Sequence, residues 1–225
     1  MLKLSFGNSK LHKLAEYLHL PKKAVAAFDL PAGYTCPMAH DCKSYAHRIT
    51  GKITDGKHMV FRCYAASTEA VFTASRKLRW HNFDALRGLN TDEMVAIINN
   101  SLPVSLKVLR VHSSGDFFSR DYFMAWVRVA EMHPEITFFG YTKIVEYVNA
   151  VKPDNFRLVY SFGGALDPLI TNEPTCRVVK SVADADALSV ACQVNPADDY
   201  DFIMAGVSFA IVIHGTQPAR VRTGS

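Results

Sequence analysis

Three cysteines in the first third of the chain are the residues with the clearest chemical potential. Five residues separate Cys36 from Cys42, and twenty separate Cys42 from Cys63, around a polar segment that contains Gly51 and Gly56. Thiolates are soft ligands that suit zinc or an iron–sulfur cluster. A cluster that is held by only three cysteines leaves one iron open to a substrate. We therefore predict a metal centre at Cys36, Cys42 and Cys63.

The identity of the metal stays open at this point. A structural zinc needs a fourth ligand and favours two to four residues between a ligand pair, so the five-residue gap fits zinc loosely. A histidine could complete such a site, and the candidates nearby are His40, His47 and His58. The plain alternative is that Cys36 and Cys63 are packed thiols that bind no metal.

Two cysteines lie far from this loop. Cys176 follows Pro174, beyond a predicted strand at 156–162, so it could reach the same end of the sheet and serve as a further ligand. His214, at the end of the last predicted strand, is a second candidate, although a lone histidine after an apolar strand is often a core residue. Cys192 is expected to be structural.

Polar residues also follow the predicted strands. Ligand sites of parallel α/β folds lie at the carboxyl ends of strands, where glycine lets a ligand approach backbone N–H groups. Lys143 could pair there with an anionic substrate group or lie in solvent. Ser119 and Asp121 are read instead as helix-capping residues. The predicted substrate-binding residues are His112, Ser114, Asp116, Thr142, Lys143, Ser161 and Gly163.

These positions depend on an alternation of strands and helices. Apolar periodicity predicts helices at 9–19, 64–79, 91–100, 119–133 and 144–151, and strands at 24–29, 106–112, 136–142, 156–162, 201–205 and 208–214. This order predicts an α/β fold with a mainly parallel sheet, either a partial or distorted TIM-like βα barrel or an open doubly wound sheet. We expect one domain over 1–217, with the cysteine-bearing loop at 34–63, and a disordered tail at 218–225.

The bulk composition limits the possible classes of protein. The 225 residues are 49% hydrophobic and 20% charged, with five cysteines and a net charge of +4. No apolar run reaches the roughly 18 residues of a membrane span, and no apolar signal core opens the chain, so we expect a cytoplasmic protein without disulfides. The basic residues Arg76, Lys77, Arg79 and His81 are read as a solvated helix face, so nucleic-acid binding is not indicated.

Four ordered motifs resemble the phage gene product 88 family. They are FDLPAGYTCP at 28–37, RCYAAS at 62–67, RVHSSGDFF at 110–118 and FGYTK at 139–143, and the resemblance runs to about Ser161 with an echo at His214–Gly215. It implies a phage protein of the host cytoplasm. It also suggests a distant similarity to radical S-adenosylmethionine enzymes, which use a partial βα barrel and a three-cysteine [4Fe–4S] cluster.

The resulting hypothesis is a phage-type [4Fe–4S] protein with a radical-SAM-like barrel. Its chemistry would be redox or radical chemistry on a small molecule or nucleotide, and the resemblance leaves open whether S-adenosylmethionine binds. The wide cysteine spacing departs from the closely spaced cysteines of those enzymes. The alternative is a zinc-stabilised, non-catalytic module that binds a host protein or nucleic acid.

Overall fold

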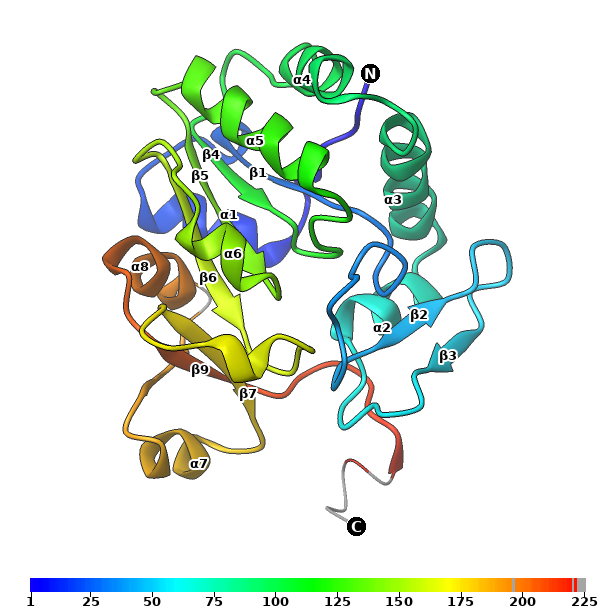
Figure 1. The fold of residues 1–225 in the computed structure, drawn as a ribbon, viewed down its shortest axis with the longest axis vertical. Helices are drawn as coiled ribbons and strands as arrows, with labels where there is room; N and C mark the ends of the chain where they lie inside the picture. The colour runs from blue at the N-terminus through cyan, green and yellow to red at the C-terminus, as the bar shows by residue number, and fades with distance from the viewer. Residues whose placement is uncertain (196, 220, 222–225) are drawn as a thin grey trace.

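A parallel β-sheet organises the chain. The computed structural model describes residues 1–195, 197–219 and 221, and within them seven strands form one sheet in the order β1-β4-β5-β6-β7-β9-β8 (Figure 1). Every pairing is parallel. The strands are β1 (Val25–Phe28), β4 (Val108–Val111), β5 (Thr137–Thr142), β6 (Phe156–Ser161), β7 (Thr175–Val179), β8 (Ala191–Cys192) and β9 (Phe209–Val212).

This sheet confirms the predicted α/β class with a mainly parallel sheet. The two edge strands, β1 and β8, do not pair with each other within the described residues, so the sheet does not close into a barrel. β1 is bordered instead by an antiparallel bridge between Ser5 and Ala27. The arrangement is compatible with the partial barrel that the sequence predicts, and the carboxyl ends of all strands face one rim.

Helices cover both faces of the sheet. One face packs against α4 (Thr91–Asn99), α5 (Arg120–Met132) and α6 (Val145–Asn149), while α1 (Ser9–Tyr17) and α8 (Asp198–Ala205) pack against the other. The remaining helices are α2 (Tyr64–Val71), α3 (Thr73–Leu86), α7 (Val182–Ala187) and two short 3-10 turns at Lys22–Ala24 and Asp167–Leu169. Among the described residues, no helix combines the length and apolar character that a membrane crossing requires.

Local signals explain where several helices begin. Ser119 caps α5, since its side chain accepts a hydrogen bond from the backbone N–H of Tyr122. The helix α4 begins at Thr91, where the sequence predicts a helix over 91–100. Asn90 is the cap, and its side chain forms a reciprocal capping box with Glu93. Such a box satisfies two backbone N–H groups that a helix cannot pair internally.

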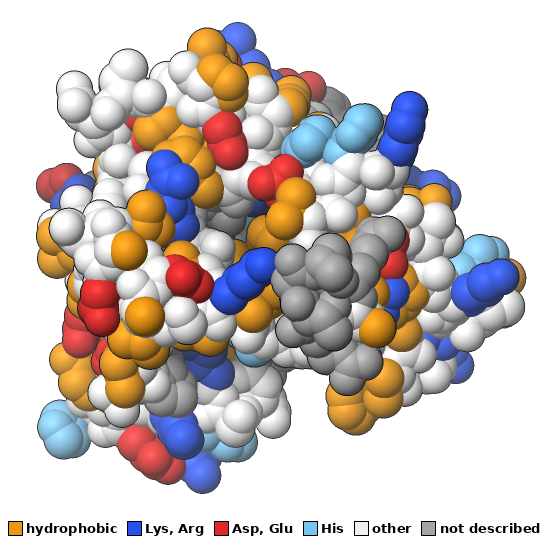
Figure 2. Space-filling view, turned by 90° about the horizontal axis from the view of Figure 1, so that it is seen from below, with side chains coloured by type: hydrophobic (Ala, Val, Ile, Leu, Met, Phe, Trp, Pro, Cys, Tyr) orange, Lys and Arg blue, Asp and Glu red, His pale blue; other side chains and the backbone are white. Residues whose placement is uncertain are grey.

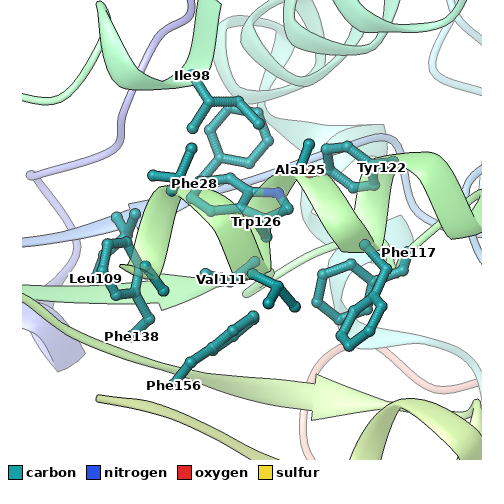
Figure 3. Close-up of a cluster of buried hydrophobic side chains, with 14 of the residues drawn as sticks. Phe28, Ile98, Leu109, Val111, Phe117, Tyr122, Ala125, Trp126, Phe138 and Phe156 are labelled. Carbon is teal, nitrogen blue, oxygen red and sulfur yellow. The ribbon is translucent and has the colours of Figure 1, made fainter. Parts of the chain in front are cut away.

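The face under α5 holds an aromatic core. Phe28, Phe138 and Phe156 from three strands meet Trp126 of α5, and Phe117 and Tyr122 extend the cluster toward the carboxyl rim (Figure 3). The rings of Phe28 and Trp126 lie edge-on with centroids 5.3 Å apart. All of these side chains are fully buried. This face is therefore a packed, mainly aromatic core.

The opposite face changes character along the strands. Farther from the carboxyl ends of the strands it is apolar, with Val25, Phe139 and Val159 packed against α1 and α8. Toward the carboxyl ends the same side carries Arg110 and Tyr141, which contact each other. Alternate residues of a strand share a face, so Lys143 and Ser161 continue this polar side.

Three predicted elements differ from the structure. The segment 201–205 is helical, as part of α8, because a short apolar run does not distinguish a strand from a buried helix turn; Gly206 ends it with a φ of +65°. The predicted helix 64–79 is divided at Phe72, which adopts an extended conformation between α2 and α3. The predicted cysteine-bearing loop at 34–63 includes a small antiparallel pair, β2 (Ser44–Ala46) and β3 (Ile53–Asp55).

The cysteine-bearing segment forms a lobe beside the carboxyl rim. β2, β3 and α2 lie off the ends of β1 and β4, and the chain that follows β9 crosses the rim to reach this lobe (Figure 1). Gln217 holds that crossing segment, because its side chain bonds the backbone N–H and C=O of Arg62. Ser67 adds a hydrogen bond to the carbonyl of Thr216. Of the tail predicted at 218–225, residues 220 and 222–225 lie outside the described residues.

Candidate functional site

The three cysteines of the lobe approach one another. Cys36 and Cys63 are half-buried residues, and Cys63 stands at the N-cap of α2. Desolvation raises the pKa of the Cys36 thiol well above its usual range, and Asp116, Cys63 and Cys42 raise it further. Desolvation and Cys42 raise the pKa of Cys63 to about 11. Both thiols are therefore protonated at neutral pH and are weak nucleophiles.

The predicted metal centre is wrong. Within the described ranges, no group of three or more His, Cys, Asp and Glu side chains is arranged to hold a metal ion. The cysteines come close enough to affect one another's pKa, yet they do not form a ligand set with Cys176 or His214. This finding overturns the [4Fe–4S] hypothesis and its radical-SAM-like chemistry. It also overturns the zinc-stabilised alternative, since that module needs a closed set of ligands.

Several predicted substrate-binding residues do come together at the ends of β4, β5 and β6. The Asp116 carboxylate accepts hydrogen bonds from the backbone N–H of Phe117 at 2.8 Å and of Lys143 at 2.9 Å. The Lys143 ammonium donates to the carbonyls of Ser161 and Phe162 at 2.7 and 2.6 Å, and to the Ser161 hydroxyl at 3.2 Å. Thr142 also bonds Asp116.

The Asp116 carboxyl is the group of this cluster whose protonation changes nearest to neutral pH. Burial raises its pKa from 3.8 to about 6, although the hydrogen bonds from Lys143, Phe117 and Thr142 oppose the shift. A carboxyl group with a pKa in this range can accept or release a proton under physiological conditions. No carboxylate lies within ion-pairing distance of the Lys143 ammonium in the described part of the chain.

Gly163 lies beside this cluster, but its backbone serves the protein itself. The N–H groups of Gly163 and Gly164 donate to the two carboxylate oxygens of Asp167, each at 2.9 Å. The carbonyl of Gly163 accepts from the N–H groups of His40 and Asp41. The glycine is required because its φ is +91° and a Cβ would press on Asp41. Its role in the structure is to join β6 to the cysteine-bearing lobe.

His112 turns away from the rim into the aromatic core. Its Nε2 lies 2.9 Å from the hydroxyl of Tyr122, and its ring lies 4.7 Å from that of Phe117. Burial lowers its pKa to about 3, so the ring is neutral at physiological pH. The residue has a φ of +69°, which is rare for a residue with a side chain and marks a tight reversal of the chain at the end of β4.

That reversal builds a buried ionic network on the lobe side. The Asp29 carboxylate accepts from the backbone N–H of Ser113 at 2.8 Å, from its hydroxyl at 2.6 Å, and from the N–H of Ser114 at 3.0 Å. Arg79 lies 3.9 Å from Asp29 and 3.0 Å from Glu69. We call Asp29, Arg79 and Glu69 the Arg79 network. Its single guanidinium serves two buried carboxylates.

Ser114 belongs to this network rather than to an open site. Its hydroxyl donates to the carbonyl of Leu30 at 2.9 Å and lies 3.3 Å from the Glu69 carboxylate. Glu69 also accepts from the backbone N–H of Ala32 at 2.8 Å. Burial raises the pKa of Glu69 in spite of the opposing charge of Arg79. The Arg79 network thereby fastens α2 and α3 to the ends of β1 and β4.

A second ionic network occupies the polar side of the sheet and was not predicted. One oxygen of the Asp199 carboxylate accepts from Lys10 at 2.7 Å, from the hydroxyl of Tyr141 at 2.8 Å, and from Arg110 at 3.4 Å. The Arg110 guanidinium also stacks over the ring of Tyr141 at 5.0 Å. We call Lys10, Arg110, Tyr141 and Asp199 the Asp199 network. Here one carboxylate serves two cations.

Partly exposed side chains surround the Asp199 network. The Lys10 side chain is 32% exposed. His214 is exposed and its ring lies 4.7 Å from that of Tyr64, whose hydroxyl donates to the carbonyl of Ser113. Burial and Asp199 raise the pKa of the Cys176 thiol to about 12, against the charges of Lys143, Lys10 and Arg110. Cys176 is thus a common neighbour of three cations.

One signal for this network is present in the sequence. Arg110 interrupts the apolar strand 106–112, and a charge inside a buried strand requires a partner. Its partners Lys10 and Asp199 lie in helices at opposite ends of the chain, 189 residues apart, so no local pattern identifies them. The helix that carries Asp199, α8, was not predicted either, because a strand was expected at 201–205.

The solvated face that the sequence predicts on α3 is only partly present: Lys77 and His81 are exposed, whereas the two arginines are not. Arg76 and Arg79 are buried, and Arg76 donates to the carbonyls of Arg48, Glu69 and Ile49. A surface groove of about 610 Å³ runs along α3, away from the strand ends. Its lining includes Lys77 and Trp80. On the face shown in Figure 2, Lys and Arg side chains are scattered and do not gather into one patch.

Comparisons with known proteins give a consistent result. A family model described as Gene product 88 matches residues 2–223. The "Gene 88 protein" of Mycobacterium phage L5 is 26% identical over 181 residues, which cover 72% of this chain and 68% of the relative. The "Gene 88 protein" of Mycobacterium phage D29 is 26% identical over 177 residues, which cover 70% of this chain and 67% of the relative. No solved structure matches the chain.

Proposed function

The chain belongs to the Gene product 88 family, and because that name states no activity, we propose from the geometry that the protein binds a small molecule at the carboxyl rim of its sheet. The family assignment confirms the resemblance that the four motifs predict. Nothing in these matches extends to radical S-adenosylmethionine enzymes. The proposed site lies over the polar side of β4, β5 and β6, between the cysteine-bearing lobe and the segment that follows β9.

One observation carries this proposal: the two sides of the sheet differ at the same rim. The side under α5 is filled with aromatic rings up to Phe117, while the other side presents Arg110, Tyr141, Lys143 and Ser161 at the ends of consecutive strands. If this side of the sheet served only as a core, apolar side chains would be expected at these positions. Parallel α/β proteins bind their ligands at this rim.

The surroundings of the site support the same function. Tyr64, Tyr141 and Ser161 are each partly exposed, whereas Arg110 and Lys143 beneath them are buried. A ligand at this rim would contact hydroxyl and aromatic groups at the surface and cationic groups deeper down. Small-molecule sites commonly combine such apolar rings with a few convergent polar groups.

A ligand screen tests the proposal. Thermal unfolding of the purified chain would be followed in the presence of a panel of nucleotides, sugar phosphates, amino acids, neutral nucleosides and S-adenosylmethionine. We expect at least one compound to raise the unfolding temperature, because a ligand that binds only the folded state stabilises it. The effect should decrease in Ser161→Ala and Tyr141→Phe, which remove rim hydroxyls.

The matched control is Arg157→Gln. Arg157 lies on β6, like Ser161, but near the other end of the strand and with a 47% exposed side chain. Its substitution should leave every ligand effect unchanged. Stabilisation that is the same in the rim variants and in the wild type would place the ligand elsewhere and overturn the proposal, as would the lack of any stabilising compound.

A further inference from the structure

The Asp199 network contains more positive than negative charge. Lys10 and Arg110 share one carboxylate, and all of their contacts to it are made to a single oxygen of Asp199. The contact from Arg110 is the longest, at 3.4 Å. A carboxylate that accepts three donors on one oxygen compensates each of them incompletely, and burial makes an incompletely paired cation unfavourable.

Arg110 retains capacity to donate. Its side chain is about nine-tenths buried, and its Nε has no hydrogen-bond partner in the described residues. The guanidinium carbon lies over the ring of Tyr141, 5.0 Å from its centroid, so this contact helps to position the side chain before any ligand arrives. A guanidinium is a planar fork of N–H donors that matches two oxygens of a carboxylate or phosphate group.

Lys143 adds a second incompletely paired charge on the same side of the sheet. Its ammonium bonds only carbonyl and hydroxyl oxygens of Ser161 and Phe162 among the described residues. The backbone of Phe162 in turn bonds the carbonyl of Cys176, which connects Lys143 to the strand pair beside the Asp199 network. Arg110, Lys10 and Lys143 therefore act on one region around Cys176.

We propose that the small molecule bound at this rim is an oxyanion, with a phosphate or carboxylate group received by Arg110 and stabilised by the charges of Lys143 and Lys10. This inference rests on the proposed function and specifies its ligand class. The oxyanion would reach Arg110 by passing the exposed His214 and the partly exposed Lys10. Asp199 then competes with the ligand for the same cations, in addition to holding them in place.

Calorimetric titration of the full chain with inorganic phosphate, adenosine monophosphate and succinate tests this inference, at constant ionic strength set with chloride. We expect saturable binding of at least one of these anions to the wild type. Arg110→Gln should weaken it by about tenfold or more, since a charge-assisted, bidentate contact is lost. Arg157→Gln, which removes an exposed cation of the same sheet, should leave the affinity unchanged.

Asp199→Asn provides a test in the opposite direction. This variant removes the competing negative charge but keeps a hydrogen-bonding side chain, so we expect it to bind the same anion several-fold more tightly. A purely structural Asp199 network would not increase affinity in this way. If Arg110→Gln does not fold, two other variants still test the inference. Lys143→Gln should weaken anion binding, whereas Asp199→Asn should strengthen it.

The outcomes separate the two proposals. Preference for phosphate and the monophosphate over succinate identifies a phosphate ligand, and tighter binding of the monophosphate identifies a phosphate ester rather than the free ion. The anion inference is overturned if none of the three anions binds, or if binding is equal in Arg110→Gln and the wild type. If neutral compounds nevertheless stabilise the protein and Ser161→Ala abolishes their effect, the small-molecule site stands without the anion.

Discussion

The Arg79 network and the Asp199 network are two buried ionic clusters at the same rim with opposite charge balance. In the first, one guanidinium lies between Asp29 and Glu69. In the second, one carboxylate lies between Lys10 and Arg110. The pKa directions follow this balance: burial outweighs Arg79 and raises the pKa of Glu69, whereas Arg110 and Lys10 outweigh burial and lower the pKa of Asp199.

The difference between them separates a structural cluster from a candidate binding site. The Arg79 network is buried throughout: Asp29 and Glu69 accept hydrogen bonds from backbone N–H groups, Arg79 donates to the carbonyl of Ala65, and only Oε2 of Glu69 has no partner among the described residues of this network. The Asp199 network reaches the surface through Lys10 and keeps an unpaired donor on Arg110. The second network is thus partly exposed through Lys10, whereas the first is buried.

The largest expected effect comes from Arg79→Met. Removal of the shared guanidinium leaves Asp29 and Glu69 buried without a cation, so we expect a loss of about 3–5 kcal/mol in the free energy of unfolding. Urea denaturation measures it, with the exposed Arg157→Met as control. A loss below about 1 kcal/mol would contradict the structural role that distinguishes this network.

Asp116 sharpens the comparison, since it is a buried carboxyl outside both networks. Its folded-state pKa is about 6 against 3.8 for the free group, so between these values the folded state binds the proton more tightly. Its contribution to stability should therefore fall as pH rises from about 4 to 7, by roughly 3 kcal/mol. Urea denaturation of Asp116→Asn and wild type across this range measures it.

The difference in unfolding free energy between Asp116→Asn and the wild type should change across this pH window and be constant below it. A difference that is independent of pH would mean that Asp116 has an ordinary pKa in the folded protein. The shift would then have no bearing on proton transfer at the rim.

Asp199→Asn should destabilise the unliganded protein at neutral pH by about 2 kcal/mol, because Lys10 and Arg110 lose their carboxylate. The sign of the pH effect is opposite to that of Asp116. Since the pKa of Asp199 is lowered by folding, its contribution is present above the unfolded value of 3.8 and is lost as pH falls through the lower folded value. Urea denaturation of the variant and the wild type at pH 7 and pH 3 measures the destabilisation and its pH dependence. An equal loss of unfolding free energy at the two pH values would contradict the ion pairing.

The smallest effect belongs to Tyr141→Phe. It removes one of the three donors to Asp199 and keeps the ring under Arg110, so we expect a loss of about 1 kcal/mol. Thermal or urea unfolding measures it, and Tyr17→Phe, which removes an exposed hydroxyl bond to Asp201, is the matched control. A loss as large as that of Asp199→Asn would show that Tyr141, rather than the cations, stabilises the carboxylate.

The sequence by itself determined the local structure and the family. The strands at 106–112, 136–142 and 156–162 and the Ser119-capped helix follow from periodicity and capping within a few residues, and the four motifs identify the relatives. It also placed Asp116, Thr142, Lys143 and Ser161 near one another, because consecutive parallel strands end at one rim.

Only the tertiary structure decided which polar groups remain available there. The amides of Gly163 and Gly164 are satisfied by Asp167, His112 turns into the aromatic core, and the cysteines approach without forming a ligand set. Lys10 meets Asp199 across 189 residues through the strand order and the docking of α1 and α8. Side-chain type is encoded at each position, but the partner that satisfies a buried charge depends on long-range packing that no local pattern contains.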